Sequence, residues 1–165
     1  MVGRVERVCA ALEAAAVRYL IVGGVAVVLH GYLRTTADLD LIIGLDADNA
    51  SRAMTALGAL GYQPRAPVAI TAYADGAQRQ RWIDEKGLTV FSRWDPDDPG
   101  AELDLFVEEP LDFEAAFARA VVFDLTTTQA RVVALDDLLA LKRRAGRPRD
   151  LDDIAALEAI AAGDR

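Results

Sequence analysis

The sequence predicts an α/β domain in which a β-sheet is covered by helices. Two observations support this prediction. Short apolar segments typical of strands are interleaved along the whole chain with segments of helical spacing. Hydrophobic residues make up 53% of the sequence and charged residues 27%, with no repeat and no linker, so the chain can bury a core of its own. At 165 residues the chain has an ordinary domain size, and we expect residues 1–165 to form a single domain.

The individual elements are expected where hydrophobic periodicity is sustained and turn residues interrupt it. In chain order they are a helix over 4–16, a strand over 18–24 that runs into a glycine turn, a two-turn helix that ends at Gly31, a strand over 38–43, helices over 47–60 and 77–86, strands over 87–94 and 101–108, a helix over 112–119, a hairpin or two edge strands within 121–135, and helices over 135–145 and 150–161. Residues 64–76 indicate no clear element, and residues 95–100 are expected to form a loop.

Composition argues against several classes of protein. The longest apolar segment, residues 19–29, is too short to span a bilayer and contains a glycine pair, and the N-terminal segment lacks the pattern of a signal peptide. We therefore expect a cytoplasmic protein with no membrane contact. The single cysteine, Cys9, excludes an internal disulfide, and with His30 it is too little for a zinc site of thiolates and imidazoles. Any bound metal needs oxygen ligands, which favours Mg²⁺ or Mn²⁺.

The net charge of −8 argues against tight, indiscriminate binding to nucleic acid. The charge is unevenly distributed, because residues 94–117 hold nine acids and no base, whereas residues 142–149 hold five bases and no acid. Such runs are often solvated faces. An acidic centre and a basic rim in one small domain would also suit a magnesium-bound polyphosphate.

Two carboxylates, Asp38 and Asp40, stand one residue apart at the head of an apolar run. In a strand, residues two apart point to the same face, so both side chains share one small volume. Like charges this close raise each other's cost of ionisation, which a cation between them would relieve. The alternative is a solvated strand entry, since aspartate often hydrogen-bonds backbone amides in turns. From the pair alone, both interpretations stay open.

A glycine pair and a third carboxylate extend this pattern. Gly23 and Gly24 lie between a strand and a helix, where backbone amides can cradle phosphate, although such turns more often serve packing. Asp104 lies between two leucines in the middle of a predicted strand, where a lone charge would be costly. If this strand lies beside that of Asp40, three carboxylates converge, as two-metal catalysis requires.

These residues carry a resemblance to a known family. The segment VGGVAVVLHGYLRTTADLDLII, with ELDLF further on, resembles the DNA polymerase β-type nucleotidyltransferase superfamily. Its motif joins a Gly-Gly or Gly-Ser turn, a helix, an Asp-x-Asp strand and a third Asp on a neighbouring strand. The closing segment LDDLLALKRRAGRPRDLDDIAAL is similar to the end of small bacterial members, including nucleotidyltransferase toxins of the abortive-infection type. The resemblance covers residues 19–44, 101–108 and 135–157, and it implies a mixed sheet flanked by helices, with two closing C-terminal helices.

The resemblance also implies roles for the three carboxylates and the glycines. Gly23 and Gly24 would hold the phosphates of a nucleoside triphosphate, while Asp38 and Asp40 would ligate Mg²⁺ or Mn²⁺. Asp104 would ligate the catalytic ion and position or deprotonate the acceptor hydroxyl.

Three further residues match the resemblance less directly. Arg34 would contact phosphate, unless it is an exposed loop arginine. Lys142 and Asp150 match the toxin-like ending, and their alternative interpretations are a basic helix face and a helix N-cap. We interpret His30 as a structural hydrogen-bonding residue.

The function expected from the resemblance is transfer of a nucleoside monophosphate from a nucleoside triphosphate to an acceptor hydroxyl by a two-metal mechanism. The acceptor can be RNA, protein or a small molecule. Two alternatives remain: a non-catalytic nucleotide-binding module, and a toxin that is paired with an antitoxin partner.

Overall fold

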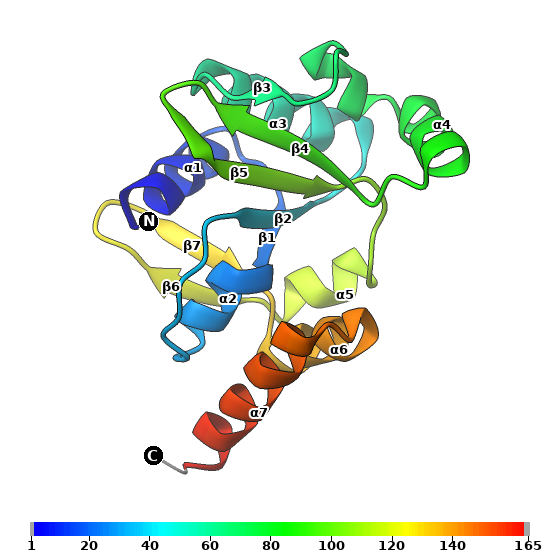
Figure 1. Ribbon diagram of the computed structural model, residues 1–165. Helices are drawn as coiled ribbons and strands as arrows, with labels where there is room; N and C mark the ends of the chain where they lie inside the picture. The colour runs from blue at the N-terminus through cyan, green and yellow to red at the C-terminus, as the bar shows by residue number, and fades with distance from the viewer. Residues whose placement is uncertain (1, 164–165) are drawn as a thin grey trace.

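A computed structural model describes residues 2–163 of the chain. Seven strands form one mixed sheet in the order β3-β4-β5-β2-β1-β7-β6 (Figure 1). Their bounds are β1 (Tyr19–Val22), β2 (Leu39–Ile43), β3 (Gln63–Pro64), β4 (Val90–Asp95), β5 (Asp98–Phe106), β6 (Val121–Asp124) and β7 (Gln129–Val132). Strand β1 runs antiparallel to β2 and parallel to β7, and β2 runs parallel to β5.

Helices join and cover these strands. Their bounds are α1 (Val2–Ala14), α2 (Gly23–Leu29), α3 (Ala47–Ala59), the 3₁₀-helix η1 (Ile70–Ala74), α4 (Gly76–Lys86), α5 (Phe113–Ala118), α6 (Leu135–Ala145) and α7 (Pro148–Ala162). Helix α1 packs against α3 and β7, while α6 contacts both α2 and α7. Figure 1 shows α6 and α7 together below the sheet, with α7 extending toward the C-terminus.

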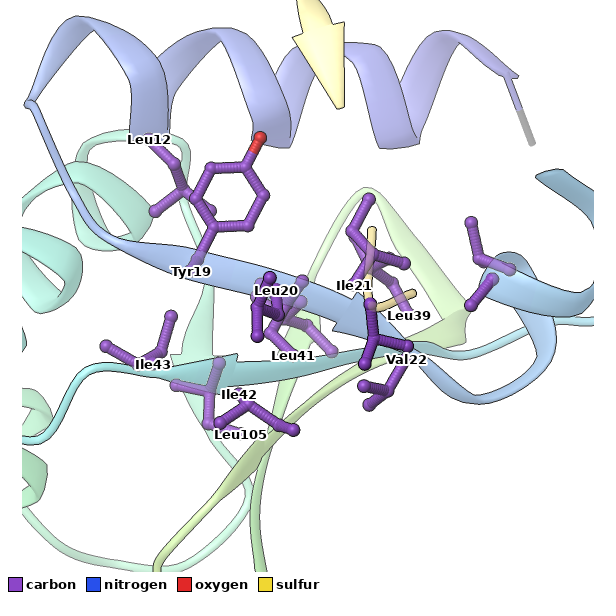
Figure 2. Close-up of a cluster of buried hydrophobic side chains, with 14 of the residues drawn as sticks. Leu12, Tyr19, Leu20, Ile21, Val22, Leu39, Leu41, Ile42, Ile43 and Leu105 are labelled. Atoms are coloured by element: carbon purple, nitrogen blue, oxygen red, sulfur yellow. The ribbon is translucent and has the colours of Figure 1, made fainter. Parts of the chain in front are cut away.

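The hydrophobic core lies around β1 and β2. All four residues of β1 are buried, as are four of the five in β2, because helices and neighbouring strands surround this part of the sheet. Figure 2 shows Leu12 of α1 next to the ring of Tyr19, and Leu105 of β5 next to the side chains of β2. Asp40 is the polar exception in β2, so its position in a buried strand needs an explanation beyond packing.

The strand register brings the predicted motif residues together. Val22, the last residue of β1, pairs with Asp40, and Asp40 pairs in parallel register with Asp104 of β5. Gly23 follows Val22 directly and begins α2. The glycine turn and two carboxylates therefore lie in one row across three neighbouring strands.

The expected mixed α/β fold with two closing helices is confirmed. The loop expected over residues 95–100 is wrong: β5 already begins at Asp98, and Asp95 pairs with it in a tight hairpin. Proline and glycine in this segment concealed the start of β5, which extends beyond the residues 103–105 that pair with β2, so missing ladder bonds on that side are tolerated. Residues 121–135 contain a hairpin formed by β6 and β7. Strand β7 also pairs with β1 on its other side, so β6 is the edge strand of the two. The last helix begins at Pro148, two residues earlier than expected.

Candidate active site

Three carboxylates line one cleft beside the glycine turn. Asp40 and Asp104 are in-register neighbours on parallel strands and therefore point to the same face of the sheet. Asp38 precedes β2 by one residue, is exposed, and lines the same cleft. The parity that the sequence indicated thus places both members of the Asp38/Asp40 pair on the cleft side, with Asp104 next to them.

Gly23 is required by this arrangement for two reasons. Its φ of +64° lies in the left-handed region that favours glycine, and a Cβ there would collide with the carboxylate of Asp40. At Gly24 a Cβ would collide with the hydroxyl of Thr36, and the Gly24 amide hydrogen-bonds Asp40. The backbone therefore approaches the cleft more closely than any side chain would allow.

The electrostatics of the carboxylate pair are unfavourable without a cation. Burial, followed by the charges of Asp104 and Asp38, raises the pKa of Asp40 to about 6. Burial also raises the pKa of Asp104, against a hydrogen bond from Ser92, its partner on β4. Both acids thus lie where ionisation is resisted, which is typical of functional carboxylates.

The donor chemistry of these residues fits a hard divalent cation. Oδ1 of Asp104 is buried and has no hydrogen-bond partner among the described residues, so one carboxylate oxygen is left for another ligand. Oxygen donors of this kind suit Mg²⁺ or Mn²⁺. Within residues 2–163, however, no three His, Cys, Asp or Glu side chains already lie close enough together to enclose an ion. A bound ion would thus require small side-chain adjustments.

The opposite wall of the cleft is a network of ion pairs around two buried acids, Asp150 and Asp153. Arg34 makes a two-pronged contact with Asp153 of α7, with Nε–Oδ1 at 2.6 Å and Nη2–Oδ2 at 2.9 Å. Lys142 of α6 lies 2.7 Å from Asp153 and 3.1 Å from Asp150. Arg147 completes the network at 2.7 Å from Asp150. The network joins α6 and α7 to the segment that precedes Asp38.

The network resolves the alternative interpretations of three residues. Arg34 is no free loop arginine, since its side chain is only 14% exposed and is paired with Asp153. Lys142 lies inside the network, where its side chain is 6% exposed, so it belongs to no solvated face. Asp150 is the third residue of α7, and it accepts a hydrogen bond from the backbone amide of Arg147. It therefore caps the helix from inside, while it also binds Lys142.

Opposing effects act on the pKa of the two acids in this network, and hydrogen bonds together with nearby positive charges outweigh burial. Burial alone would raise the pKa of Asp150, but hydrogen bonds from Arg147 and Lys142 lower it to about 2. Burial acts on the pKa of Asp153 in the same direction, and hydrogen bonds from Arg34 and Lys142 again lower it. Both acids are therefore charged at neutral pH and keep the bases in place.

The cleft has two halves, which meet at Asp40 and Asp104. The polar half has a volume of about 240 Å³ and is lined by the residues Gly23, Gly24, Arg34, Thr36, Asp38, Asp40, Asp104, Lys142, Arg147, Arg149 and Asp150. The apolar half has a volume of about 430 Å³ and continues between α6 and the strands β4 and β5. The polar half thus brings together all eight residues that the sequence singled out.

Sequence reasoning missed several residues of the site. Arg147 and Arg149 belong to the basic run over 142–149, which indicated a basic rim without distinguishing its members. Asp153 lies three residues after Asp150 on the same helical face, and this spacing was its only signal. The interpretation of His30 as a structural residue agrees with its position, because its Nε2 lies 2.8 Å from the carbonyl oxygen of Val133.

Comparisons with known proteins agree with this fold. The structure is similar to the antibiotic-resistance factor ANT(2'')-Ia, with a TM-score of 0.61 and 13% identity over 98% of this chain and 83% of that chain. It is also similar to the lincosamide antibiotic adenylyltransferase LnuA in its lincomycin-bound form, with a TM-score of 0.58 and 17% identity over 90% of both chains. An antigenic nucleotidyltransferase-like protein from Paracoccidioides brasiliensis gives a TM-score of 0.51 and 18% identity, over 88% of this chain and 69% of that chain.

These similarities show that the chain has the nucleotidyltransferase fold. The resemblance seen in the sequence is therefore confirmed at the level of the fold. A scan of protein-family models and a search of curated proteins gave no match. Across the described part of the chain, none of the helices is both long enough and apolar enough to cross a membrane.

Proposed function

We propose that this protein transfers a nucleoside monophosphate from a nucleoside triphosphate to an acceptor hydroxyl. The observation that carries the proposal is the in-register pair Asp40 and Asp104 beside the Gly23–Gly24 turn, opposite a basic wall. This arrangement places negative charge where a metal-bound phosphate needs it and positive charge where the remaining phosphates lie. The similar structures, among them a lincosamide antibiotic adenylyltransferase, support the same class of reaction.

Asp38, Asp40 and Asp104 would hold Mg²⁺ or Mn²⁺. The bound ions would neutralise charge on the triphosphate and on the leaving pyrophosphate. The raised pKa of Asp40 and the unpartnered oxygen of Asp104 support this assignment, since a bound cation would stabilise the charge of both carboxylates.

The other residues of the chain position the nucleotide. Gly23 and Gly24 line the polar half and are assigned to the phosphates, and Arg149 and Arg147 add positive charge at the rim of the same half. Arg34 and Lys142 are held by Asp153 and act mainly by fixing the wall and its potential. Asp104 accepts the proton of the acceptor hydroxyl as the oxygen attacks the α-phosphorus. Catalysis is therefore mostly positioning and electrostatics.

Labelling tests this proposal. The protein is incubated with each α-³²P-labelled nucleoside triphosphate, with Mg²⁺ or Mn²⁺ and with total cell lysate, and the labelled fraction is separated into RNA, protein and small molecules. We expect label in one fraction with the wild type and none with Asp104→Asn. Label in RNA or protein would favour the toxin that the sequence resemblance suggests. Loss of this labelling when a second protein is co-expressed would identify that protein as an antitoxin. Nucleotide binding without transfer to any fraction would favour the non-catalytic module.

A further inference from the structure

The two halves of the cleft differ sharply in chemistry. The residues found only in the polar half include Arg34, Asp38 and Arg149, and none of them has an apolar side chain. The apolar half is lined by seven apolar residues, which are Val22, Val90, Phe106, Pro110, Leu138, Leu141 and Ala145. The carboxylates of Asp40 and Asp104 line both halves.

From this division we propose that the acceptor is a small hydroxylated molecule with a large apolar surface, and that it binds in the apolar half. The proposal rests on the nucleotidyl transfer proposed above. It adds the acceptor's chemical class and the side from which it approaches, neither of which follows from the fold.

In-line chemistry decides which half receives the acceptor. The attacking oxygen and the leaving oxygen lie on opposite sides of the phosphorus. Pyrophosphate carries most of the negative charge, so it belongs in the polar half, near Arg149 and Gly24. The α-phosphorus then lies at Asp40 and Asp104, where the halves meet. The acceptor hydroxyl must approach from the other side, which is the apolar half.

The shape of the apolar half favours a small molecule over a macromolecule. Its volume of about 430 Å³ suits a small molecule, and so does its lining, in which apolar side chains lie beside polar groups that are mostly shared with the polar half. Arg144 is the only charged residue found in this half alone, and its guanidinium donates to the carbonyl oxygen of Pro110. That contact links α6 to the segment after β5. The two bases that line both halves, Lys142 and Arg147, are paired with Asp150, so the described residues of this half offer an RNA phosphate no unpaired base.

The proposed step balances as follows. The acceptor R–OH loses its proton to Asp104, which later releases it to solvent. A bond forms between the acceptor oxygen and the α-phosphorus, and the bond from that phosphorus to pyrophosphate breaks. The products are R–O–NMP, pyrophosphate and one proton, and no oxidation occurs.

Acceptor competition tests the chemical class. Two primary alcohols of similar size are compared with the labelled nucleoside triphosphate that the wild type binds best: 2-(2-naphthyl)ethanol, which is apolar, and glucose, which is polar. A short RNA with a free 3′-hydroxyl is the third acceptor. We expect kcat/KM for naphthylethanol to exceed that for glucose by at least about tenfold, because only the former buries apolar surface in the cleft. Preference for glucose or RNA would overturn the proposal.

A matched pair of variants tests the location. Val90→Trp fills the apolar half, whereas Val122→Trp places the same side chain on the edge strand β6, where Val122 is 43% exposed. In Val90→Trp we expect kcat/KM for naphthylethanol to fall by about tenfold or more, while the Kd for the nucleotide stays within about twofold. Val122→Trp should change neither. If Val90→Trp fails to fold in a thermal melt, Thr89→Trp, at an exposed position of the same wall, takes its place.

The outcomes separate the two proposals. Loss of nucleotide affinity in Val90→Trp alone would mean that the apolar half holds the nucleobase, which overturns the acceptor assignment and leaves the transfer reaction intact. Transfer to RNA or protein but to neither alcohol would also overturn the acceptor assignment and leave the transfer reaction intact. A wild type that binds no nucleoside triphosphate and labels nothing would overturn the proposed function itself.

Discussion

At the scale of single residues, Asp40 is the most informative side chain. It lies in an otherwise buried strand, pairs with Asp104, and is hydrogen-bonded by the Gly24 amide. Burial and two neighbouring carboxylates raise its pKa to about 6, so its charge at neutral pH opposes folding. Such a residue is retained at the expense of stability, which is the usual sign that it serves a ligand or a reaction.

Replacing Asp40 with asparagine should therefore stabilise the protein in the absence of metal. A carboxyl group whose pKa rises from 3.8 unfolded to about 6 folded favours folding below pH 4, and this contribution is lost as the pH rises to 6. At pH 7.5 Asp40→Asn should raise the free energy of unfolding by about 1–3 kcal/mol, and the gain should vanish near pH 3.5. Denaturant melts at both pH values measure this. Lower stability of the variant at pH 7.5 would show that the protein satisfies the charge of Asp40.

Gly23 allows a second test at this scale, with Gly87 as its control. Both have similar positive φ angles, +64° and +59°, but a Cβ at Gly87 meets nothing within 4 Å, whereas one at Gly23 collides with Asp40. Gly87→Ala should lower the free energy of unfolding by about 1 kcal/mol through backbone strain alone. Gly23→Ala should lower it by about 1–2 kcal/mol more and also abolish transfer. Equal losses in both variants, with transfer intact, would contradict a role for the close approach at Gly23.

At the scale of elements, the two closing helices form one wall of the site. The buried pairs of Asp153 with Arg34 and Lys142 fasten α7 to α6 and to the segment before β2. Because the pKa of Asp153 and that of Asp150 lie below their usual values, both acids stabilise the fold above pH 4. The contribution of Asp150 is lost as the pH falls toward 2, and that of Asp153 is lost in the same direction. An exposed pair, Arg143 with Glu158, also links α6 to α7.

The buried pairs of Asp153 and the exposed pair of Glu158 should differ greatly in their contribution to stability. Asp153→Asn leaves two buried bases without their counter-charge and should lower the free energy of unfolding by about 3–5 kcal/mol. Glu158→Gln removes the exposed pair between the same helices and should change the free energy of unfolding by less than about 1 kcal/mol. Urea unfolding of both variants is the measurement. Similar small effects would mean that Asp153 does not hold the wall of the cleft.

At the scale of the whole molecule, local signals and long-range contacts contributed differently to what the sequence could predict. The spacing of Asp38 and Asp40 and the glycine turn are local, so the motif could be recognised before the fold was known. Asp153 could not be recognised, because its partner Arg34 is 119 residues away in sequence. The hairpin at Asp95–Asp98 was hidden by its turn residues, and its buried Asp95 pairs with Arg7, 88 residues away.

The charge distribution of the whole molecule predicts weak binding to RNA. The net charge is −8, and all five bases of the basic run 142–149 already have partners: Lys142, Arg143 and Arg147 bind acidic side chains, while Arg144 and Arg149 donate to backbone carbonyls. RNA affinity should therefore be no better than micromolar at physiological salt and should fall steeply as salt rises. Filter binding at 50 and 200 mM salt would measure it. Nanomolar affinity that persists at the higher salt concentration would contradict this view of the surface.

The position of the transferred phosphate tests the central claim most directly. The protein is given one nucleoside triphosphate labelled at either the α- or the γ-phosphate, with Mg²⁺ and the acceptor that the labelling experiment identifies. With the wild type we expect the α-label to enter the acceptor and the γ-label to leave as pyrophosphate. Asp104→Asn should remain folded, but it should neither label the acceptor nor release labelled pyrophosphate. Transfer of γ-label to the acceptor, or α-label transfer undiminished in Asp104→Asn, would contradict it.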